Sequence, residues 1–282
     1  MIVFGKSGQV ATELARLLPK ATFLSREEAD LSDPASCAQK IRDLKPDAVI
    51  NAAAYTAVDK AEEEEPLAHL INAAAPTAMA EACAELGIPF VQISTDYVFD
   101  GAGETGFAPE HPTEPLGAYG RTKLAGENGV RAAGGAFAIL RTSWVFSAHD
   151  NNFVKTMLRL AETRDTLTVV SDQIGGPTSA RAIAHACVAI AERLKRDEGV
   201  AGTYHFSGTP DVSWADFARE IFAQSGKHIA VQDVPSCDYP TPAARPANSR
   251  LDCRTTEAVF GIPRPNWREE LALVLSDLEV QK

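Results

Sequence analysis

The sequence lacks several features that would assign it to a specialised class of protein. Its five cysteines are scattered and odd in number, and no Cys-x-x-Cys or Cys/His spacing suggests a zinc site or a disulfide framework. We therefore expect inert thiols in a reducing cytoplasm. No apolar run approaches the ~20 residues needed to cross a bilayer. No charged segment precedes the first apolar run, as it would in a signal peptide. These absences predict a cytoplasmic protein without a membrane partner.

The sequence also has no excess of positive charge. Its net charge is −11 and its sequence pI is near 5.1. A nucleic-acid partner would require a basic face, so the composition argues against one, although a local Arg/Lys cluster can still bind an anionic substrate. The 45% hydrophobic and 23% charged residues are normal for a globular protein. The 282 residues allow one large domain or two of ordinary size, without internal repeats or low-complexity segments.

A glycine-rich turn stands near the start of the chain, directly after the apolar run of residues 1–4. It reads Gly5-Lys6-Ser7-Gly8-Gln9-Val10, and residues 9–18 after it place their apolar side chains on one helix face. Strand, glycine turn and helix are the setting of the dinucleotide-binding fingerprint. Gly5 permits the tight turn, Gly8 lets the backbone approach a pyrophosphate, and the helix N-terminus supplies free N–H groups.

The segment Tyr119-Gly120-Arg121-Thr122-Lys123 places a tyrosine and a lysine on one face of a predicted helix. An ammonium beside a phenol favours the phenolate and lowers the phenol pKa from its reference of about 10. For an isolated match, an exposed aromatic beside a solvated lysine is the simpler interpretation. In a chain that opens with a dinucleotide turn, the pair predicts hydride transfer to or from a carbonyl, with Tyr119 handling the proton.

Strands alternate with helices through the first half of the chain. The predicted strands are 1–4, 22–24, 47–51, 89–95 and 136–142, and the predicted helices are 9–18, 34–44, 119–132 and a long region 59–86 interrupted near Pro66 and Pro76. This alternation predicts an α/β fold, a Rossmann-type doubly wound parallel sheet. Ligands bind beyond the carboxyl ends of such strands. The residues expected to gather along that edge are Gly5, Ala52, Ala53, Ala54, Thr95 and Trp144.

The regular alternation breaks beyond Trp144. Predicted helices at 152–163, 179–195, 213–225 and 267–278 accompany a strand at 203–206 and a proline-rich loop at 239–246. We predict two interleaved domains. Residues 1–145 with 179–207 form the dinucleotide-binding domain, and residues 146–178 with 208–282 form a smaller substrate lobe.

These motifs resemble the dTDP-4-dehydrorhamnose reductases, a family of extended short-chain dehydrogenases. The glycine turn and the Tyr-x-x-x-Lys pair are shared by the whole superfamily. The narrower matches are Ser94-Thr95-Asp96-Tyr97-Val98-Phe99 and Tyr239-Pro240-Thr241-Pro242-Ala243-Ala244-Arg245-Pro246, and matches follow the family's order over nearly the whole chain. The resemblance implies reduction of the C4 ketone of dTDP-4-dehydro-L-rhamnose by NAD(P)H, the last step of dTDP-L-rhamnose synthesis.

The resemblance also implies roles for particular residues. At the reacting carbonyl, Tyr119 protonates the oxygen, Thr95 donates a hydrogen bond to it, and Lys123 holds the nicotinamide ribose. With Tyr119 and Lys123, the implied cofactor contacts are Gly5, Ser7, Gly8, Gln9, Val10, Arg26, Asp30, Leu31, Ala52, Ala53, Ala54 and Thr56. With Thr95, the implied sugar-nucleotide contacts are Tyr97, Trp144, Asn152 and Arg245. Without the resemblance, Thr95 would be a strand residue and Tyr97 a core aromatic, whereas Trp144 is as easily a core residue as a contact.

The choice of cofactor and the metal requirement stay open. Arg26 stands about 20 residues beyond the glycine turn, where an arginine favours the 2′-phosphate of NADPH over NADH. Some members of the family dimerise through magnesium held by glutamates, and Glu13 matches one such position. A glutamate on the exposed face of the first helix is the simpler interpretation, so both Mg²⁺ and a homodimer remain open.

Two other functions also remain open. Another nucleotide-sugar reductase or epimerase of the superfamily would use the same hydride machinery with a different sugar pocket. A non-catalytic regulatory subunit, like the relatives that bind methionine adenosyltransferase, would keep the cofactor site without turnover. The intact set of Thr95, Tyr119 and Lys123 favours an enzyme.

Overall fold

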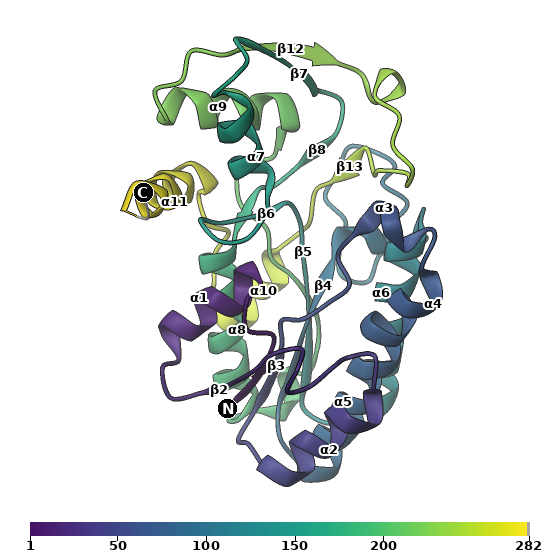
Figure 1. The fold of residues 1–282 in the computed structure, drawn as a ribbon. Helices are drawn as coiled ribbons and strands as arrows, with labels where there is room; N and C mark the ends of the chain where they lie inside the picture. The colour runs from purple at the N-terminus through teal and green to yellow at the C-terminus, as the bar shows by residue number, and fades with distance from the viewer. Residues whose placement is uncertain (281–282) are drawn as a thin grey trace.

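A six-stranded sheet forms the centre of the larger part of the computed structural model, which describes residues 1–280 (Figure 1). Its strands are β1 (Ile2–Phe4), β2 (Thr22–Leu24), β3 (Val49–Asn51), β4 (Phe90–Thr95), β5 (Phe137–Thr142) and β10 (Gly202–His205). They lie in the order β10-β5-β4-β3-β1-β2, and every neighbouring pair is parallel. The predicted doubly wound parallel sheet is confirmed, and the chain reverses its direction of travel across the sheet between β1 and β3.

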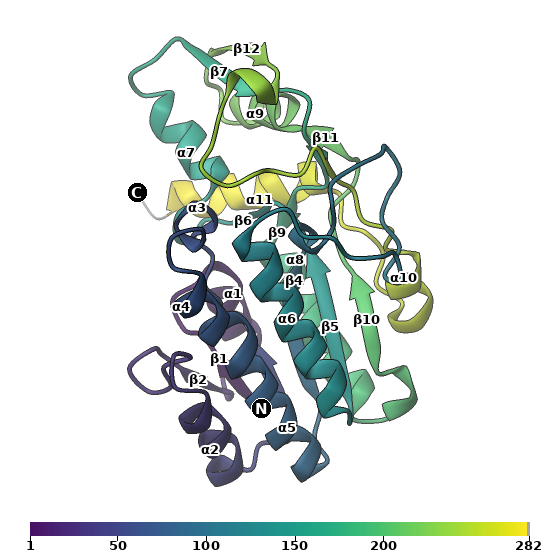
Figure 2. The same cartoon turned by 90° about the vertical axis from the view of Figure 1, so that its right-hand side faces the viewer.

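Helices cover both faces of this sheet (Figure 2). One face carries α2 (Pro34–Leu44), α5 (Ala75–Leu86) and α6 (Ala118–Ala133), and the other carries α1 (Gln9–Leu17) and α8 (Ala180–Leu194). Alternate strand residues face opposite sides, so Phe4 packs with the first group and Val3 with the second. Burial on both faces explains why the strands read as continuous apolar runs. We call this unit the sheet domain. No helix within residues 1–280 is long and apolar enough to cross a bilayer.

Several helices begin and end at residues that cap them. Asp33 accepts a hydrogen bond from Ser36 N at the start of α2, and Ser213 accepts one from Asp216 N at the start of α9 (Trp214–Gln224). Gly87 closes α5 with a φ of 63°. The long helical region is divided into α3 (Val58–Ala61), α4 (Glu65–His69), the π-helical turn η1 (Leu70–Ala74) and α5. The break near Pro66 is confirmed, whereas Pro76 lies in the first turn of α5.

A smaller upper lobe stands above the sheet domain (Figure 1). Its core is formed by α7 (Phe153–Leu160), α9, α11 (Trp267–Val280) and the parallel pair of β7 (Thr166–Val170) and β12 (Ala230–Val234).

The remaining elements of the described residues are short. They are β6 (Val145–Phe146), β8 (Ile174–Gly175), β9 (Thr178–Ser179), β11 (Val212–Ser213), β13 (Asn248–Ser249), α10 (Arg254–Phe260) and the 3₁₀ turns η2 (Asp96–Val98), η3 (Glu198–Val200) and η4 (Ser236–Asp238). Two-residue strands carry no periodicity, so the sequence did not predict them.

The cysteines fall into two groups. Cys37, Cys83, Cys187 and Cys253 are buried, and burial raises the pKa of the first three to about 12. These thiols match the expectation of inert side chains, because the thiolate is the reactive form. Cys237, in η4, is exposed.

Candidate active site

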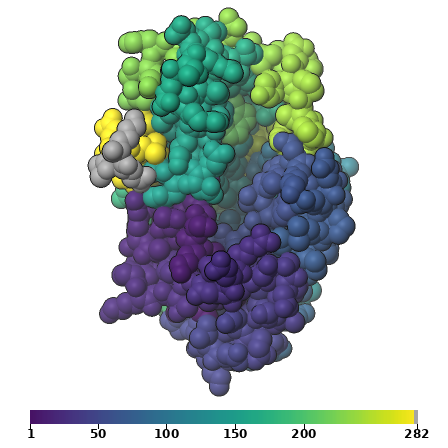
Figure 3. Space-filling view, in the orientation of Figure 1, coloured from purple at the N-terminus to yellow at the C-terminus, as the bar shows by residue number. Residues whose placement is uncertain are grey.

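A cleft of about 700 Å³ lies at the carboxyl edge of the sheet, below the upper lobe. Figure 3 shows the surface hollowed between the N-terminal segments and the lobe. The cleft begins between β1 and β3, where a doubly wound sheet binds its ligand. All predicted site residues except Asn152 and Arg245 line it. Those that do are Gly5, Ser7, Gly8, Gln9, Val10, Arg26, Asp30, Leu31, Ala52, Ala53, Ala54, Thr56, Thr95, Tyr97, Tyr119, Lys123 and Trp144.

The glycine turn leaves the N-terminus of α1 open to the cleft. Gly5 has a φ of 106°, and a Cβ there would lie 3.4 Å from the backbone of Ala52 and Ala53. Gly8 is the N-cap of α1, where no side chain caps the helix, and a Cβ there would meet nothing within 4 Å. The first N–H groups of the helix are therefore available to an anion. This cradle fits the diphosphate of a nicotinamide dinucleotide.

Two basic side chains stand at the end of the cleft beyond β2. Arg26 Nε lies 3.5 Å from Asp30 Oδ2, and Lys6 Nζ lies 3.8 Å from Glu28 Oε2. Hydrogen bonds from Ser32, with Arg26 contributing, lower the pKa of Asp30. Lys6 lines the cleft although the sequence analysis did not assign it a role. The fingerprint itself contains this lysine, so a signal for it was present.

Helix α6 carries the tyrosine and the lysine into the cleft. The rings of Tyr119 and Tyr97 meet edge to face, with centroids 5.4 Å apart. Gly120 allows this approach, because a Cβ at that position would lie 2.1 Å from the carbonyl oxygen of Tyr97. One turn further along, Lys123 is buried, and its Nζ donates a hydrogen bond to the carbonyl oxygen of Ile93 at 2.7 Å.

The expectation that Lys123 lowers the pKa of Tyr119 is wrong for this structure. Burial raises the pKa of Tyr119 to about 12, and the neighbouring Thr95 hydroxyl offsets only part of this rise. Burial also lowers the pKa of Lys123 to about 8. Loss of water around the phenol outweighs its neighbours, since desolvation disfavours the charged form of each group. Tyr119 is therefore a neutral phenol at neutral pH, which is the form that donates a proton.

Asp96 is a cleft residue to which the sequence analysis gave no role. Thr95 Oγ1 donates a hydrogen bond to Asp96 Oδ1 at 3.0 Å, while Asp96 Oδ2 is buried and has no hydrogen-bond partner among the described residues. Burial raises the pKa of Asp96 to about 6, against the opposing effect of Ser249 and Thr95. The sequence did contain a signal for Asp96, because an acidic residue that directly follows a strand lies at the edge of the sheet where ligands bind.

Asn72, in the π-helical turn η1, is a second residue that the sequence analysis missed. Its Oδ1 accepts a hydrogen bond from Tyr55 N at 2.8 Å, and its Nδ2 donates to Tyr55 O at 3.1 Å and to Thr122 Oγ1 at 3.2 Å. This amide therefore fixes the cleft loop around Tyr55 to helix α6. A buried asparagine inside an alanine-rich segment gave no sequence signal, although π turns are frequent at functional sites.

Trp144 lines the cleft and is held in an unusual conformation. Its φ is 51°, and its ring stacks on Trp214 with centroids 3.6 Å apart and an interplanar angle of 10°. A left-handed conformation costs a non-glycine residue ~1–3 kcal/mol, so the surrounding packing must maintain it. Trp144 is only half-buried, and it presents an aromatic surface to the cleft rather than filling the core.

Asn152 is committed to its own loop. It is the N-cap of α7 and accepts a hydrogen bond from Lys155 N, while its Nδ2 donates to Ser147 O at 2.8 Å and to His149 O at 3.1 Å. Its polar atoms therefore stabilise the loop between β6 and α7. The structure does not bring Asn152 to the cleft lining.

Arg245 lies outside the cleft lining and is held by a carboxylate on α3. Its Nη2 donates to Asp59 Oδ1 at 2.8 Å, and the backbone N–H of Ala243 donates to the same oxygen at 3.1 Å. The Nη1 atom of Arg245 is buried and has no hydrogen-bond partner among the described residues. Asp59 thus fixes the proline-rich loop to the sheet domain and leaves one arm of the guanidinium unused.

Glu13 is not an exposed helix residue, which corrects the expectation from the sequence. It is 6% exposed, and its Oε1 is bound by His149 Nε2 at 2.9 Å and by Arg16 Nη1 at 3.3 Å. Mg²⁺ requires several oxygen ligands. Within residues 1–280 no group of three or more His, Cys, Asp or Glu side chains could hold a metal ion. Glu13 Oε1 is already occupied by two side-chain donors of its own chain.

The sheet order, the cleft and the helix that carries Tyr119 define a Rossmann-type oxidoreductase that uses a nicotinamide dinucleotide. The family model described as RmlD substrate binding domain matches residues 1–280. A dTDP-4-dehydrorhamnose reductase from Sinorhizobium fredii is 47% identical over 95% of this chain and 94% of its own length. The chain belongs to the dTDP-4-dehydrorhamnose reductase family.

Solved structures agree with this assignment. A dTDP-4-dehydrorhamnose reductase from Clostridium acetobutylicum superposes with a TM-score of 0.92 at 36% identity, covering 99% of each chain. The dTDP-4-dehydrorhamnose reductase from Bacillus anthracis, solved in complex with NADP, gives a TM-score of 0.91 at 34% identity over 98% of each chain. The likeness therefore extends over both the sheet domain and the upper lobe.

Proposed function

We propose that the protein reduces the C4 ketone of dTDP-4-dehydro-L-rhamnose to dTDP-L-rhamnose, the last step of dTDP-L-rhamnose synthesis. The observation that carries this function is one cleft lined by Thr95, Tyr119 and Lys123 together with the open N-terminus of α1. Dehydrorhamnose reductases of similar sequence support the choice of sugar.

The reduction needs a proton for the carbonyl oxygen, and a nicotinamide cofactor supplies the hydride. Tyr119 is a neutral phenol, since burial raises its pKa to about 12. The alkoxide produced at C4 is more basic than a phenolate, so the phenol can donate its proton. General acid catalysis of this kind contributes ~10²–10⁴ in rate. Thr95 donates a hydrogen bond to the same oxygen after its single hydroxyl proton turns away from Asp96 Oδ1.

Lys123 holds the ribose next to the reacting carbon. One of its N–H groups is bound to the carbonyl oxygen of Ile93, which leaves two for the ribose hydroxyls. Because burial lowers its pKa only to about 8, the ammonium stays mostly charged at neutral pH. The Ile93 contact fixes the ammonium and limits the entropy lost on binding.

The sugar nucleotide contacts the residues on the lobe side of the cleft. Tyr97 and Trp144 offer aromatic surfaces for the deoxysugar or the thymine ring. Arg245 lies outside the cleft lining, so the arm that Asp59 leaves free has to turn into the cleft to bind the diphosphate in a charge-assisted contact. Asn152 contributes to sugar-nucleotide binding indirectly, because its hydrogen bonds stabilise the loop between β6 and α7.

NADPH is the preferred cofactor. Lys6 and Arg26 place two positive charges at the end of the cleft where an adenosine 2′-phosphate would lie. The NADP bound by the Bacillus anthracis reductase supports this preference. Comparison of kcat/KM for NADPH and NADH tests it, and a higher value with NADH would reject it.

The division into two domains follows the hydrophobic cores. Residues 1–145 with 179–207 form the dinucleotide-binding domain, and residues 146–178 with 208–282 form the sugar-nucleotide lobe. Two core clusters flank the six-stranded sheet, and a third unites α7, α9 and α11. Helix α10 is a local exception, because Phe260 packs against Tyr204 of β10 with ring centroids 4.7 Å apart.

The test is NADPH oxidation with enzymatically prepared dTDP-4-dehydro-L-rhamnose, with identification of the product. We expect stoichiometric formation of dTDP-L-rhamnose by the parent protein and by a Tyr204→Phe control, whose hydroxyl bonds only to Val200 O. A panel of other nucleotide sugars separates related reductases, and an epimerase would convert its sugar without net NADPH consumption. A regulatory subunit would oxidise no NADPH with any keto sugar and would bind a stoichiometric protein partner.

A further inference from the structure

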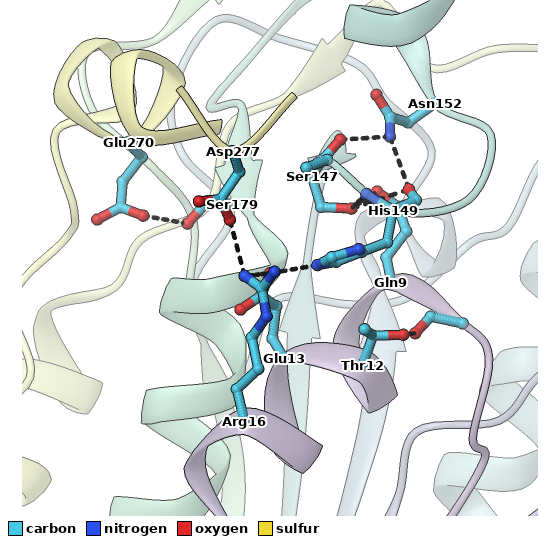
Figure 4. Close-up of polar contacts among 12 residues, drawn as sticks. Gln9, Thr12, Glu13, Arg16, Ser147, His149, Asn152, Ser179, Glu270 and Asp277 are labelled. Atoms are coloured by element: carbon cyan, nitrogen blue, oxygen red, sulfur yellow. Dashed lines mark hydrogen bonds and ion pairs between the residues drawn. The ribbon is translucent and has the colours of Figure 1, made fainter. Parts of the chain in front are cut away.

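A continuous set of hydrogen bonds joins helix α1 to the loop between β6 and α7 (Figure 4). We call Gln9, Glu13, Ser147 and His149 the clasp. Gln9 and Glu13 lie on α1, which opens onto the cleft, whereas Ser147 and His149 belong to the loop that leads into the upper lobe. The clasp joins segments more than 130 residues apart in the sequence, because Gln9 and Ser147 are separated by 138 residues and Glu13 and His149 by 136.

The first contact of the clasp is a nearly buried pair. His149 Nε2 lies 2.9 Å from Glu13 Oε1, and the two side chains are 13% and 7% exposed. Arg16 Nη1 reaches the same oxygen at 3.3 Å and Asp277 Oδ2 of α11 at 2.7 Å. A buried carboxylate is costly unless it is hydrogen-bonded and paired, so Glu13 depends on these donors.

The second contact reaches the cofactor turn. Ser147 Oγ accepts a hydrogen bond from His149 N at 3.1 Å and lies 2.9 Å from Gln9 Oε1 and 3.0 Å from His149 O. Its single proton can serve only one acceptor. Gln9 Oε1 is the nearer of the two acceptors, and it is the one that joins Ser147 to α1. The amide nitrogen of Gln9 is then left for a ligand at the N-terminus of α1.

The loop also contributes directly to the cleft. Asp150 and Asn151 follow His149 and line the same cleft as the glycine turn. Asp150 has a φ of 49°, a conformation that neighbouring contacts must maintain. His149 anchors this segment on one side and Asn152 on the other. The clasp therefore fixes both Gln9 and the Asp150–Asn151 part of the cleft lining.

We propose that the clasp is a positioning device that sets the affinity of the protein for its nicotinamide cofactor. Ser147 and His149 act through Gln9 and the Asp150–Asn151 segment, which are held in the binding arrangement before the cofactor arrives. Preorganisation of this kind improves affinity by reducing the entropy lost on binding. The inference rests on the proposed cofactor use. Within residues 1–280 no hydrogen bond joins the clasp to Thr95, Tyr119 or Lys123, so its effect falls on binding more than on chemistry.

The experiment measures the dissociation constant of NADPH for the sugar-free protein, by fluorescence titration. The variants are Ser147→Ala, His149→Ala and His149→Gln, with His185→Ala on the exposed side of α8 as the control. We expect Ser147→Ala and His149→Ala to weaken NADPH binding about fivefold, the equivalent of one hydrogen bond of ~1 kcal/mol. His149→Gln, whose amide can donate to Glu13, should retain most of the affinity, and His185→Ala should match the parent.

Three further readouts separate positioning from general damage. In the clasp variants, the KM for NADPH should rise by a larger factor than the KM for the sugar nucleotide. The factor by which kcat falls should be smaller than the factor by which each KM rises. Ser147→Ala with His149→Ala should weaken binding by less than the product of the single effects, because both act through one loop. Circular dichroism of Ser147→Ala, which removes only one oxygen, should match the parent.

The proposal is overturned by unchanged NADPH affinity in folded His149→Ala, by a His149→Gln variant as weak as His149→Ala, or by equal rises in both KM values. These failures differ from failure of the proposed function. NADPH binding that depends on the clasp, without turnover of dTDP-4-dehydro-L-rhamnose, would reject the substrate and retain the clasp. If the protein turned over dTDP-4-dehydro-L-rhamnose but the clasp variants bound NADPH with parental affinity, the substrate would be retained and the clasp proposal rejected.

Discussion

At the scale of single residues, Tyr119 gives the sharpest test of the chemistry. We expect Tyr119→Phe to lower kcat by ~10²–10⁴, the usual contribution of a general acid. NADPH affinity should stay within about twofold, because the hydroxyl acts on the developing alkoxide and not on the cofactor in the ground state. Single-turnover kinetics and NADPH titration measure the two effects. Near-parental kcat in Tyr119→Phe would remove the proton-donor assignment.

Arg245 provides a test of the nucleotide end of the cleft. Arg245→Ala should raise the KM for the sugar nucleotide about tenfold, since a hydrogen bond to a charged group contributes ~1.5–3 kcal/mol. Its effect on kcat should be smaller, because the contact is remote from the carbonyl. Arg245→Lys should recover only part of the loss, as an ammonium cannot reproduce the guanidinium fork.

A matched control for Arg245 is Arg254→Ala, because Arg254 has an exposed side chain that pairs with Asp252. It should leave both kinetic constants unchanged. If folded Arg245→Ala kept the parental KM, its pairing with Asp59 would be a surface contact worth under about 1 kcal/mol, and the diphosphate assignment would be rejected.

Asp96 predicts a particular dependence of stability on pH. Its pKa is raised from 3.8 to about 6 in the folded protein. As the pH rises from about 4 to about 6, the unfolded chain releases this proton and the folded chain retains it, so the free energy of unfolding falls. The loss is about 3 kcal/mol for a shift of ~2 pKa units, and it persists above pH 6.

Asp96→Asn lacks this titration, so its stability relative to the parent should increase between pH 4 and pH 7. Urea unfolding of both proteins across this range measures the difference, and other carboxylates cancel in the comparison. A difference that does not change with pH would show that Asp96 is ionised in the folded protein as readily as in the unfolded chain.

At the scale of an element, the close approach of α6 to η2 places Tyr119 and Lys123, the proposed catalytic pair. A Cβ at residue 120 would lie 2.1 Å from Tyr97 O, which is backbone and cannot move alone, so Gly120→Ala should displace α6. We expect kcat to fall by about 10², the effect of a ~1 Å misplacement, together with a lower melting temperature. Gly202→Ala is the control, because its Cβ would make an ordinary contact at 3.6 Å. Parental kcat in Gly120→Ala would contradict this account.

The helices and strands also show which parts of the structure could be predicted from the sequence alone. The strands buried on both faces read as apolar runs, and caps such as Asp33 and Ser213 marked helix starts, so the sheet and its ligand edge were predictable. The residues predicted from strand ends line the cleft, namely Gly5, Ala52, Ala53, Ala54, Thr95 and Trp144, whereas most other candidate site residues came from the family resemblance. Burial of Glu13 was not predictable, because its partner His149 lies on a distant loop.

The pKa of Tyr119 escaped prediction for the same reason. The desolvation that raises it comes from elements that pack around the helix, whereas the Tyr-x-x-x-Lys spacing describes only the helix itself. The π-helical turn around Asn72 and the two-residue strands likewise depend on tertiary contacts and leave no periodic pattern in the sequence.

At the scale of the whole molecule, cofactor binding should stabilise both parts of the protein. The three tryptophans belong to the upper lobe or stack on it, since Trp214 and Trp267 pack in its core and Trp144 stacks on Trp214. Their fluorescence therefore reports on the lobe, although the glycine turn, the proposed cofactor site, lies in the sheet domain. The clasp and the Asp59–Arg245 pair connect the two parts.

NADPH at about 100 times its dissociation constant should raise the free energy of unfolding by ~2.7 kcal/mol. We expect the same increase whether unfolding is followed by tryptophan fluorescence or by far-ultraviolet circular dichroism. If NADPH shifted the circular dichroism transition and left the fluorescence transition in place, the two parts would unfold independently.

The distribution of thiols has a practical consequence for observing this protein at work. Cys37, Cys83, Cys187 and Cys253 are buried with raised pKa values, so they stay protonated and resist alkylation. Cys237 alone among the cysteines is exposed, and it stands only a few residues before the proline-rich loop that carries Arg245. A maleimide fluorophore should therefore attach at one position without any engineered cysteine. Its emission would record the movement of that loop as the nucleotide sugar arrives.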